Sequence, residues 1–224
     1  MKNILVIGDR SLSDYLEHHL GPRGFTVETA PDAEEGVALA GAERHALVVL
    51  AADHDVLRRI RAVSMVPVVV VLPDFDHEAC ITCLELGADD CLFRPINPRE
   101  LVARVRAIQR RAGRGWPDGD ELTGELLTAG ELKLETGSRT AWRADTELPL
   151  TGVEFTLLEV LVRGAGRVLS RELLTRQVLG RRFGPFDRAI DVHVSSLRRK
   201  LGEDGSVRIR TVRGQGYLFA SHAD

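Results

Sequence analysis

The 224-residue sequence has few cysteines and no long apolar run, and both shortages exclude classes of protein. Three cysteines are an odd number, so the chain lacks the complete disulfide framework of a small secreted domain. No apolar run approaches the roughly 18 residues that a membrane helix needs. The start, MKNILVIGD, reaches an aspartate too early for the apolar region of a secretory signal. These features predict a cytoplasmic protein with no membrane partner.

The motifs of several common enzyme classes are also missing. The chain has no Walker A motif, no glycine fingerprint of a dinucleotide-binding fold and no Ser-His-Asp arrangement on strand ends. We therefore expect a protein that is not an enzyme and that carries neither a cofactor nor a metal ion.

The net charge of −3 conceals an asymmetry between the two parts of the chain. Residues 1–125 carry 14 Lys and Arg against 21 Asp and Glu, a net charge of −7, whereas residues 126–224 carry 16 against 12, a net charge of +4. An acidic front and a basic back indicate that only the back part meets a polyanion, although four excess cations are also typical of a solvated face.

Strand and helix patterns alternate through residues 1–112. Buried strands are expected at Ile4–Ile7, Phe25–Thr29, Leu47–Leu50, Val66–Leu72 and Cys91–Phe93, with helices at Leu12–Leu20, Ala33–Ala40, Val56–Val63, His77–Leu86 and Pro98–Arg111. Five such units predict a doubly wound α/β domain with a parallel sheet. A glycine-rich, charged stretch without periodicity follows, and we interpret residues 113–125 as a linker.

Residues 126–224 have a different pattern. Short strands are expected at Glu131–Glu135, Thr140–Arg143 and Glu147–Leu150. Three helices then begin at Thr151, which forms a capping box with Glu154, at Ser170 and at Asp187. A hairpin over 208–219, with a glycine turn, ends the pattern.

Two sets of motifs resemble the OmpR/PhoB family of response regulators. RAIDVHVSSLRRKLG, IRTVRGQGYLF and LTGVEFTLLEVLVRGAGRVLSRELL resemble its winged-helix effector domain, and LELGADDCLFRPINPRELVARVRAI resembles its receiver domain. The resemblance spans nearly the whole chain. It implies a flavodoxin-like receiver at 1–112, a winged helix-turn-helix domain at 126–224, and a transcription regulator that binds double-stranded promoter DNA, with direct-repeat half-sites.

The resemblance also implies a phosphorylation site, yet its key positions have changed. In the family an aspartate after the third strand accepts the phosphoryl group, an acidic pair after the first strand holds Mg²⁺, and a lysine and a hydroxyl side chain bind the phosphoryl oxygens. The matching positions here are Ala51, Gly8 with Asp9, Arg94 and Leu72. A methyl group cannot be phosphorylated, so we expect an atypical regulator that acts independently of phosphorylation.

Two alternatives stay open for the input to the receiver-like domain. Asp53, two residues beyond Ala51, is a substitute acceptor in a conventional phosphorelay. Redox or ligand sensing is the other alternative. Cys80 and Cys83 form a C-x-x-C pair and Cys91 begins the next strand, although free cysteines are also typical small core residues.

The resemblance implies that the receiver-like domain forms a homodimer. The matching positions carry an apolar pair, Leu84 and Val102, surrounded by charged residues that an ordinary solvated helix would also show. The charged residues are Glu85, Asp89, Asp90, Arg104 and Arg106.

The remaining expected sites lie in the winged-helix domain. On the Asp187–Leu201 helix, the resemblance makes Val192, Ser195 and Ser196 candidates for base contacts that face outward. The candidates for phosphate contacts on that helix are Arg188, His193, Arg198 and Arg199. Thr211 and Arg213 belong to the hairpin, and Arg213 at its tip is the candidate for the minor groove. The loop before the helix matches the segment that contacts RNA polymerase in the family's activators, and its candidates are Arg181, Arg182, Phe183 and Phe186.

Overall fold

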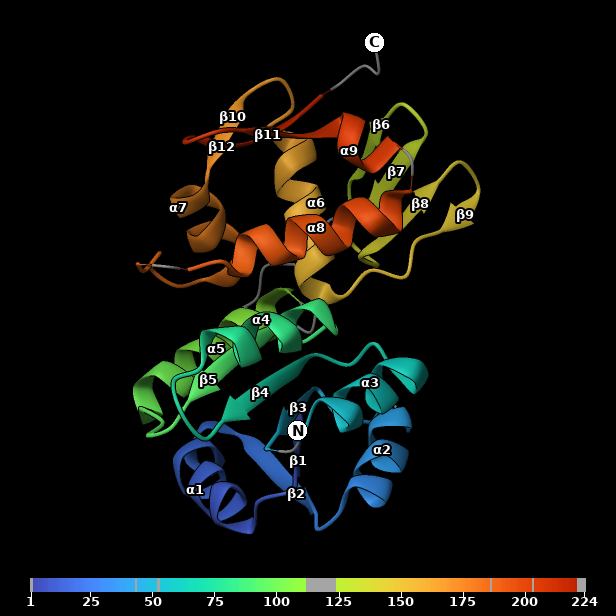
Figure 1. Ribbon diagram of the computed structural model, residues 1–224. Helices are drawn as coiled ribbons and strands as arrows, with labels where there is room; N and C mark the ends of the chain where they lie inside the picture. Colours follow the sequence, from blue (N-terminus) through green and yellow to red (C-terminus); the bar gives the residue numbers. More distant parts are fainter. Residues whose placement is uncertain are drawn as a thin grey trace. The chain divides into compact units, whose positions relative to one another are not determined.

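The computed structural model describes residues 2–42, 44–51, 53–111, 124–185, 187–202 and 204–220. The chain divides into two compact units, Met1–Gln109 and Arg110–Asp224 (Figure 1). Most of the predicted linker, 113–123, lies outside the described residues. Among the helices in the described ranges, none has both the length and the apolar character to cross a bilayer.

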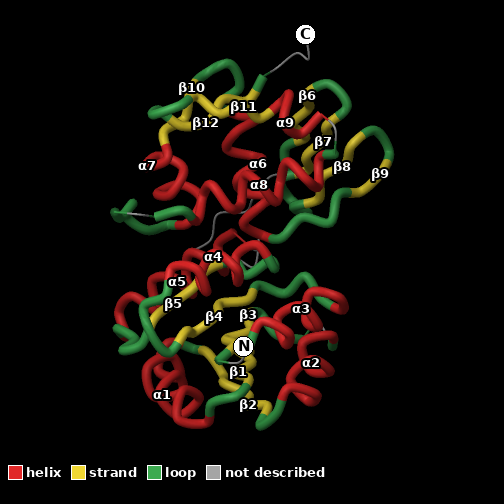
Figure 2. The backbone as a smooth tube through the Cα atoms, viewed as in Figure 1, coloured by secondary structure: helices red, strands yellow, loops and turns green. Residues whose placement is uncertain are grey.

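The first unit is built on a parallel five-stranded sheet with the order β2-β1-β3-β4-β5 (Figure 2). This order is that of a flavodoxin-like doubly wound fold, so the predicted fold is confirmed. The central strand β3 pairs with a neighbour on each side, and all four of its residues are fully buried. The strands are β1 (Lys2–Ile7), β2 (Phe25–Ala30), β3 (Leu47–Leu50), β4 (Val68–Leu72) and β5 (Asp90–Phe93).

Helices connect these strands and lie on both sides of the sheet (Figure 1). They are α1 (Arg10–Leu20), α2 (Ala33–Gly41), α3 (His54–Val63), α4 (His77–Glu85) and α5 (Pro98–Arg111). The first four each begin after an aspartate whose side chain accepts a hydrogen bond from the helix backbone, which explains where they start. These aspartates are Asp9, Asp32, Asp53 and Asp76.

The second unit starts with an antiparallel sheet of β6 (Leu126–Ala129), β7 (Leu132–Glu135), β8 (Thr140–Arg143) and β9 (Thr146–Glu147). The sequence patterns did not indicate β6. The expected strand at Glu147–Leu150 is wrong beyond its first residue, because the Leu150 amide donates to the Leu148 carbonyl at 2.8 Å and turns the chain toward the next helix.

Helices α6 (Gly152–Arg163) and α8 (Ala189–Leu201) form the centre of the second unit. The capping box of α6 is confirmed: the Glu154 amide donates to Thr151 Oγ1 at 3.3 Å, and the Thr151 amide donates to the Glu154 carboxylate at 2.7 Å. Shorter helices complete the unit, namely α7 (Arg171–Leu174), a π turn over Thr175–Leu179 and α9 (Asp204–Arg208).

A second sheet, ordered β10-β12-β11, ends the unit. It consists of β10 (Val168–Ser170), β11 (Ile209–Val212) and β12 (Gly216–Phe219). Gly216 pairs with Ser170, and a Cβ at position 216 would lie 2.0 Å from the Leu169 carbonyl oxygen, so only glycine fits there. The hairpin β11-β12, which follows helix α8 in the chain, confirms the predicted winged helix-turn-helix fold.

Candidate functional site

The changed positions of the first unit meet at the carboxyl edge of its sheet, where open α/β folds place their ligands. Ala51 directly follows β3, and its amide donates to the Ile7 carbonyl at the end of β1 at 3.0 Å. Arg94 follows β5, and its amide donates to the Leu72 carbonyl at the end of β4 at 3.1 Å. The position matching the phosphoacceptor thus presents a methyl group between the strand ends.

Asp9 is the one acidic residue of the expected Mg²⁺ pair that the sequence keeps, and its carboxylate is already engaged. It accepts hydrogen bonds from the Leu12 amide at 3.0 Å and the Ser11 hydroxyl at 2.7 Å, and it forms an ion pair with Arg94. Burial acts to raise the pKa of Asp9, but the two hydrogen bonds and the Arg94 charge outweigh it and lower the pKa. Arg94, the residue expected at the phosphoryl-binding lysine position, is therefore paired with a carboxylate of the protein itself.

The candidate substitute acceptor, Asp53, serves as the N-cap of α3. Its carboxylate accepts hydrogen bonds from the Asp55 and Val56 amides at 2.9 and 3.3 Å. Asp55 itself forms an exposed ion pair with Arg58 at 3.3 Å. Within the part of the chain that the structure describes, no group of three or more His, Cys, Asp or Glu side chains is arranged to hold a metal ion.

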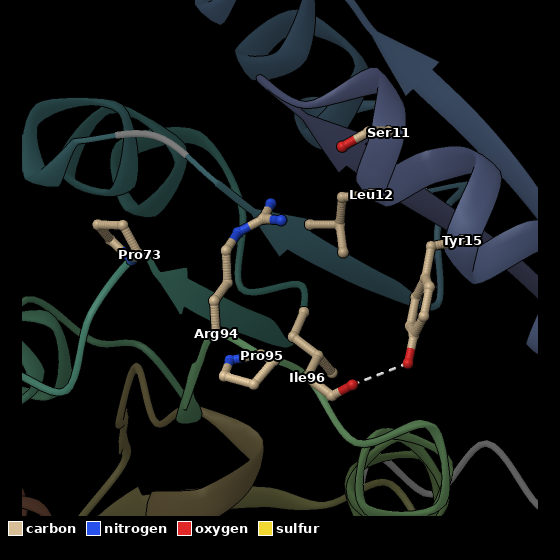
Figure 3. Close-up of a pocket in the computed structure, with 7 residues that line it drawn as sticks. All are labelled: Ser11, Leu12, Tyr15, Pro73, Arg94, Pro95 and Ile96. Atoms are coloured by element: carbon tan, nitrogen blue, oxygen red, sulfur yellow. Dashed lines mark hydrogen bonds between the residues drawn. The ribbon is translucent and has the colours of Figure 1, made fainter.

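A pocket of about 540 Å³ opens beside this edge (Figure 3). Arg94 and the Ser11 hydroxyl supply polar groups, and the Tyr15 hydroxyl closes one side by donating to the Ile96 carbonyl at 2.8 Å. The lining is otherwise mainly apolar. The lining residues are Ser11, Leu12, Tyr15, Pro73, Arg94, Pro95 and Ile96.

The expected dimer surface differs from the prediction in its apolar and acidic members. Leu84 and Val102 are only 3% and 8% exposed, so they do not form an exposed apolar patch. Asp89 is 1% exposed because it serves the fold: it accepts from Arg61 Nη2 at 2.9 Å and from the Val68 amide at 2.8 Å.

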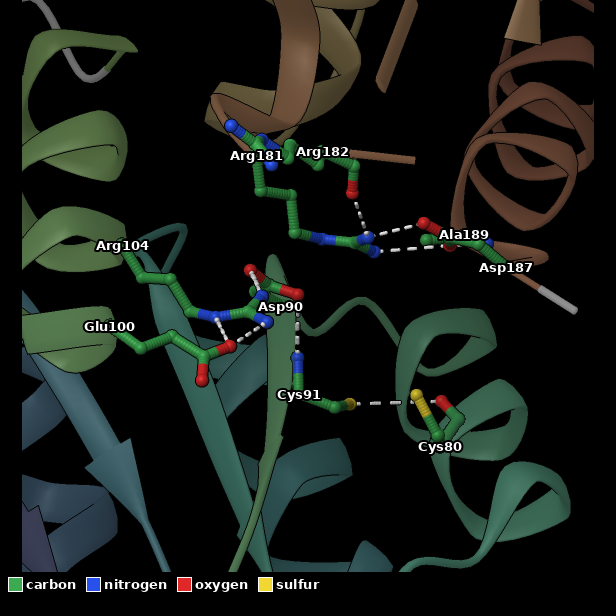
Figure 4. A network of polar contacts seen from close by, with 9 residues as sticks. All are labelled: Cys80, Asp90, Cys91, Glu100, Arg104, Arg181, Arg182, Asp187 and Ala189. Atoms are coloured by element: carbon green, nitrogen blue, oxygen red, sulfur yellow. Dashed lines mark hydrogen bonds and ion pairs between the residues drawn. The ribbon is translucent and has the colours of Figure 1, made fainter. Parts of the chain in front are cut away.

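Two other charged members of that surface, Asp90 and Arg104, are paired with each other. Asp90, which is 3% exposed, forms an ion pair with Arg104, and Arg104 also donates to Glu100 at 2.6 Å (Figure 4). Glu85 is exposed. The Arg106 side chain lies outside the described residues.

Helix α8 of the second unit carries most of the expected DNA-contacting residues. Its apolar stripe is confirmed, since Ile190, Val194, Leu197 and Leu201 are at most 2% exposed. The buried side is wider than this stripe, because Ala189, His193 and Ser196, spaced four and three residues apart, are also buried along its flank.

This wider buried side corrects three expected roles. His193 is 2% exposed and so is not presented to a phosphate, and Ser196, at 5%, does not face outward. Val192, expected to face outward, is 7% exposed. Ser195, Arg188 and Arg199 are exposed, as a contact with DNA requires.

Arg198 links helix α8 to strand β11 by hydrogen bonds. Its guanidinium donates to the Ile209 carbonyl at 2.9 Å and to the Thr211 hydroxyl at 2.8 Å, both on β11. The candidate phosphate contact is therefore a residue that also links α8 to β11. Arg213 lies exposed in the turn between β11 and β12, beside Gly214, whose φ is 72°.

The sequence analysis did not identify three residues that connect the hairpin and α7 to α8, namely Arg171, Asp191 and Tyr217. Asp191 accepts from Arg171 Nε at 2.8 Å and from the Tyr217 hydroxyl, and it also pairs with Arg188 at 3.1 Å. Burial and then the Asp191 carboxylate raise the pKa of Tyr217 to about 12, so its hydroxyl stays a hydrogen-bond donor. The sequence feature that could have indicated this role is Asp191 itself, an acidic residue in the first turn of the otherwise basic helix α8.

The loop before α8 presents part of the expected polymerase contact. Arg182 is exposed, and Phe183 is 42% exposed. Arg181 instead pairs with Asp187, which also accepts from the Ala189 amide at 3.2 Å (Figure 4). Phe186 lies outside the described residues.

Comparisons with known proteins agree with this arrangement. Residues 145–219 match the family described as "Transcriptional regulatory protein, C terminal". The transcriptional regulatory protein CpxR of Klebsiella pneumoniae subsp. pneumoniae is 41% identical over 230 residues, and that of Escherichia coli (strain K12) is 40% identical, each match covering 98% of both chains. A solved structure of a RitR mutant has a TM-score of 0.71 and 26% identity, and the match covers 98% of this chain and 99% of that one.

Proposed function

The chain belongs to the OmpR/PhoB family of response regulators and is a DNA-binding transcription regulator, and on this basis we propose that it binds DNA without being phosphorylated. The observation that carries the proposal is Ala51, which stands after β3 where the family has its acceptor. A methyl group has neither the nucleophilic oxygen nor the charge that phosphoryl transfer needs.

The surroundings of Ala51 support the same proposal. Mg²⁺ takes several oxygen ligands with near-ideal octahedral geometry, whereas the edge keeps a single acid, Asp9, which is paired with Arg94. Leu72 replaces the hydroxyl that binds a phosphoryl oxygen. Asp53 caps α3 through its Oδ1, which accepts both backbone hydrogen bonds, so phosphorylation of the other oxygen would turn this acceptor from a carboxylate into a weaker carbonyl oxygen.

In the proposed complex the second unit reads DNA with α8 and the β11-β12 hairpin. Ser195 supplies the exposed hydroxyl for a base edge, and Arg188 and Arg199 supply charge for phosphates. Arg213, which is exposed at the hairpin tip, enters the minor groove in this proposal. Direct contact of bases with Val192 or Ser196 would require both side chains to be uncovered first.

The proposed DNA-bound form is a cytoplasmic homodimer on direct-repeat half-sites. Family membership supports this assembly, and Arg182 with Phe183 offers an exposed cationic and aromatic surface to RNA polymerase. Half-sites about one helical turn apart, roughly 10–10.5 bp, suit two tandem winged-helix domains.

One experiment tests the proposal. The full chain is incubated with acetyl phosphate and Mg²⁺, and its intact mass and its affinity for a two-site operator are measured before and after. We expect both to stay unchanged, and we expect sedimentation to show two chains per operator in each case. A stoichiometric gain of one phosphoryl group, lost in the Asp53→Ala variant, would establish the substitute acceptor instead.

A further inference from the structure

The pocket at the edge of the first unit is built from parts of the chain that are far apart in the sequence. Ser11, Leu12 and Tyr15 belong to α1, whereas Pro73 and residues 94–96 belong to the segments that follow β4 and β5. The volume of about 540 Å³ lies within the range of about 300–1,000 Å³ that small-molecule sites occupy. DNA binding through the second unit gives this space no role.

The hydrogen-bonding side chains of the pocket differ in what they offer to a ligand. The Ser11 hydroxyl donates to Asp9 at 2.7 Å. The Tyr15 hydroxyl donates to the Ile96 carbonyl at 2.8 Å, so neither hydroxyl keeps a proton for a ligand. The Arg94 guanidinium carries several N–H groups, and Asp9 is its only acceptor among the residues that the structure describes. The remaining N–H groups of Arg94 are therefore the side-chain donors that the pocket offers.

The charge at this edge is already balanced. Arg94 and Asp9 form an ion pair in which the two side chains are 38% and 24% exposed, and the other lining residues are uncharged. An anionic ligand at Arg94 would meet the like charge of the Asp9 carboxylate. An uncharged acceptor can use the remaining N–H groups and leave the ion pair intact. The pocket therefore favours an uncharged ligand over a carboxylate or a phosphate.

The walls of the pocket are mainly apolar. Pro73 and Pro95 contribute their rings, and Leu12 and Ile96 add branched side chains (Figure 3). Proline has no side-chain freedom to lose when a ligand binds, so these walls are well suited to hold an apolar group. Figure 3 shows the Arg94 guanidinium reaching between Pro73 and the α1 side chains, where it can also lie over the face of an aromatic ring.

We propose that this pocket binds an uncharged, mainly apolar small molecule that presents a hydrogen-bond acceptor, such as a carbonyl oxygen, to Arg94. The apolar part of the ligand lies against Leu12, Ile96 and the two prolines. This binding goes beyond the proposed function and does not depend on phosphorylation. Its failure in the test below is therefore distinguishable from a failure of the acetyl phosphate experiment.

The test uses the isotope-labelled full chain and follows its backbone amide signals by NMR. Acetophenone, an uncharged aromatic ketone, is the probe, and for a molecule of this size we expect a dissociation constant on the order of 1 mM. Toluene, which lacks the acceptor, should bind roughly tenfold more weakly, and benzoate, which is anionic, should bind more weakly than acetophenone. The signals expected to shift are those of the lining residues that carry an amide proton, among them Leu12, Tyr15, Arg94 and Ile96.

Three outcomes would overturn the proposal. The first is the absence of shifts at these residues at the solubility limit of acetophenone. The second is tighter binding of benzoate than of acetophenone, which would indicate an anion site. The third is equal binding of toluene and acetophenone, which would remove the role of Arg94 as the donor.

Two variants locate the site. Arg94→Met should weaken acetophenone binding roughly tenfold and leave toluene binding unchanged, because it removes the donor and keeps an apolar side chain of similar length. The matched control is Arg58→Met, which changes an exposed arginine of α3 and should affect neither probe.

The second variant, Ser11→Trp, should block both probes by filling the pocket from α1. Ser11 is exposed, so the larger side chain need not enter the core. Unchanged amide signals of β1 and β3 show that each variant is folded. If folded Ser11→Trp bound both probes as well as the unsubstituted chain, the proposed location would be wrong.

Discussion

The carboxyl edge of the first unit and the surface formed by α8 and the hairpin in the second unit differ in whether their charged side chains are paired or exposed. At the carboxyl edge of the first unit, the remaining acids are engaged by the protein: Asp9 by Arg94, and Asp53 by the start of α3. In the second unit, Arg199 and Arg213 are exposed on the helix and hairpin that face DNA in the proposed complex. Under the proposed function, the sheet is kept although Gly8 and Ala51 carry no acid at its carboxyl edge, because neither position belongs to the buried core.

The largest expected effect is the loss of stability in the Asp89→Ala variant. This change tests whether the ion pair of Asp89 with Arg61 stabilises the first unit. Asp89→Ala leaves Arg61 uncompensated in a buried setting, and breaking such a pair typically costs about 3–5 kcal/mol. Hydrogen exchange of amides in β3 and β4 measures this loss for the first unit alone. The matched control, Asp55→Ala, removes an exposed pair and should cost about 1 kcal/mol or less. Equal effects of the two changes would remove the proposed role of Asp89.

Arg198 and Arg199 are adjacent on α8 but differ in their expected roles. Arg198 stabilises the hairpin, whereas Arg199 contacts DNA in the proposed complex. Arg198→Ala removes hydrogen bonds to Ile209 and Thr211, so we expect the hairpin to lose roughly 1.5–3 kcal/mol of protection in hydrogen exchange. Arg199→Ala should leave protection unchanged and lower the salt slope of DNA binding by about one. If both variants changed only the salt slope, the structural role of Arg198 would be wrong.

Arg213 tests the minor-groove role of the hairpin. Arg213→Ala should weaken binding roughly tenfold, or about 1.4 kcal/mol, at sites with a narrow A·T-rich minor groove, and less at G·C-rich sites. Binding titrations on a series of operators that differ only at this position would measure the difference. Equal losses on both kinds of site would indicate an ordinary phosphate contact.

Ser195 gives the smallest expected effect. Ser195→Ala deletes one neutral hydrogen bond, about 1 kcal/mol or less, and should alter the preference among half-sites more than the overall affinity. Ser196→Ala is the matched control, since Ser196 is 5% exposed and should not affect half-site preference. Competition between half-site sequences measures both variants, and a larger shift for Ser196→Ala would reverse the assignment.

The sequence predicted the elements that rest on local patterns. The strands of the parallel sheet and the Thr151–Glu154 capping box follow from short-range periodicity and capping chemistry. The strand-end positions, Ala51 among them, could be placed because parallel strands end at one edge.

Long-range side-chain pairing could not be predicted. Asp89 looked like a surface acid until its contact with Arg61, 28 residues away, placed it in the interior. Tyr217 meets Asp191 across 26 residues, and only the packing of the hairpin on α8 brings them together. Helical position alone likewise did not indicate that Ser196 and His193 are buried.

Gly8 has a consequence for how such a chain could evolve. Its φ of 88° lies in the left-handed region, where most residues with a Cβ are disfavoured by roughly 1–2 kcal/mol and Asp or Asn is tolerated occasionally. Regaining phosphotransfer would require an acid at position 8 in this conformation, an aspartate at position 51 and a hydroxyl at position 72. Any one of these changes alone restores no reaction for selection to favour. If the proposed function is right, the loss of the phosphorylation site is therefore easier to acquire than to reverse.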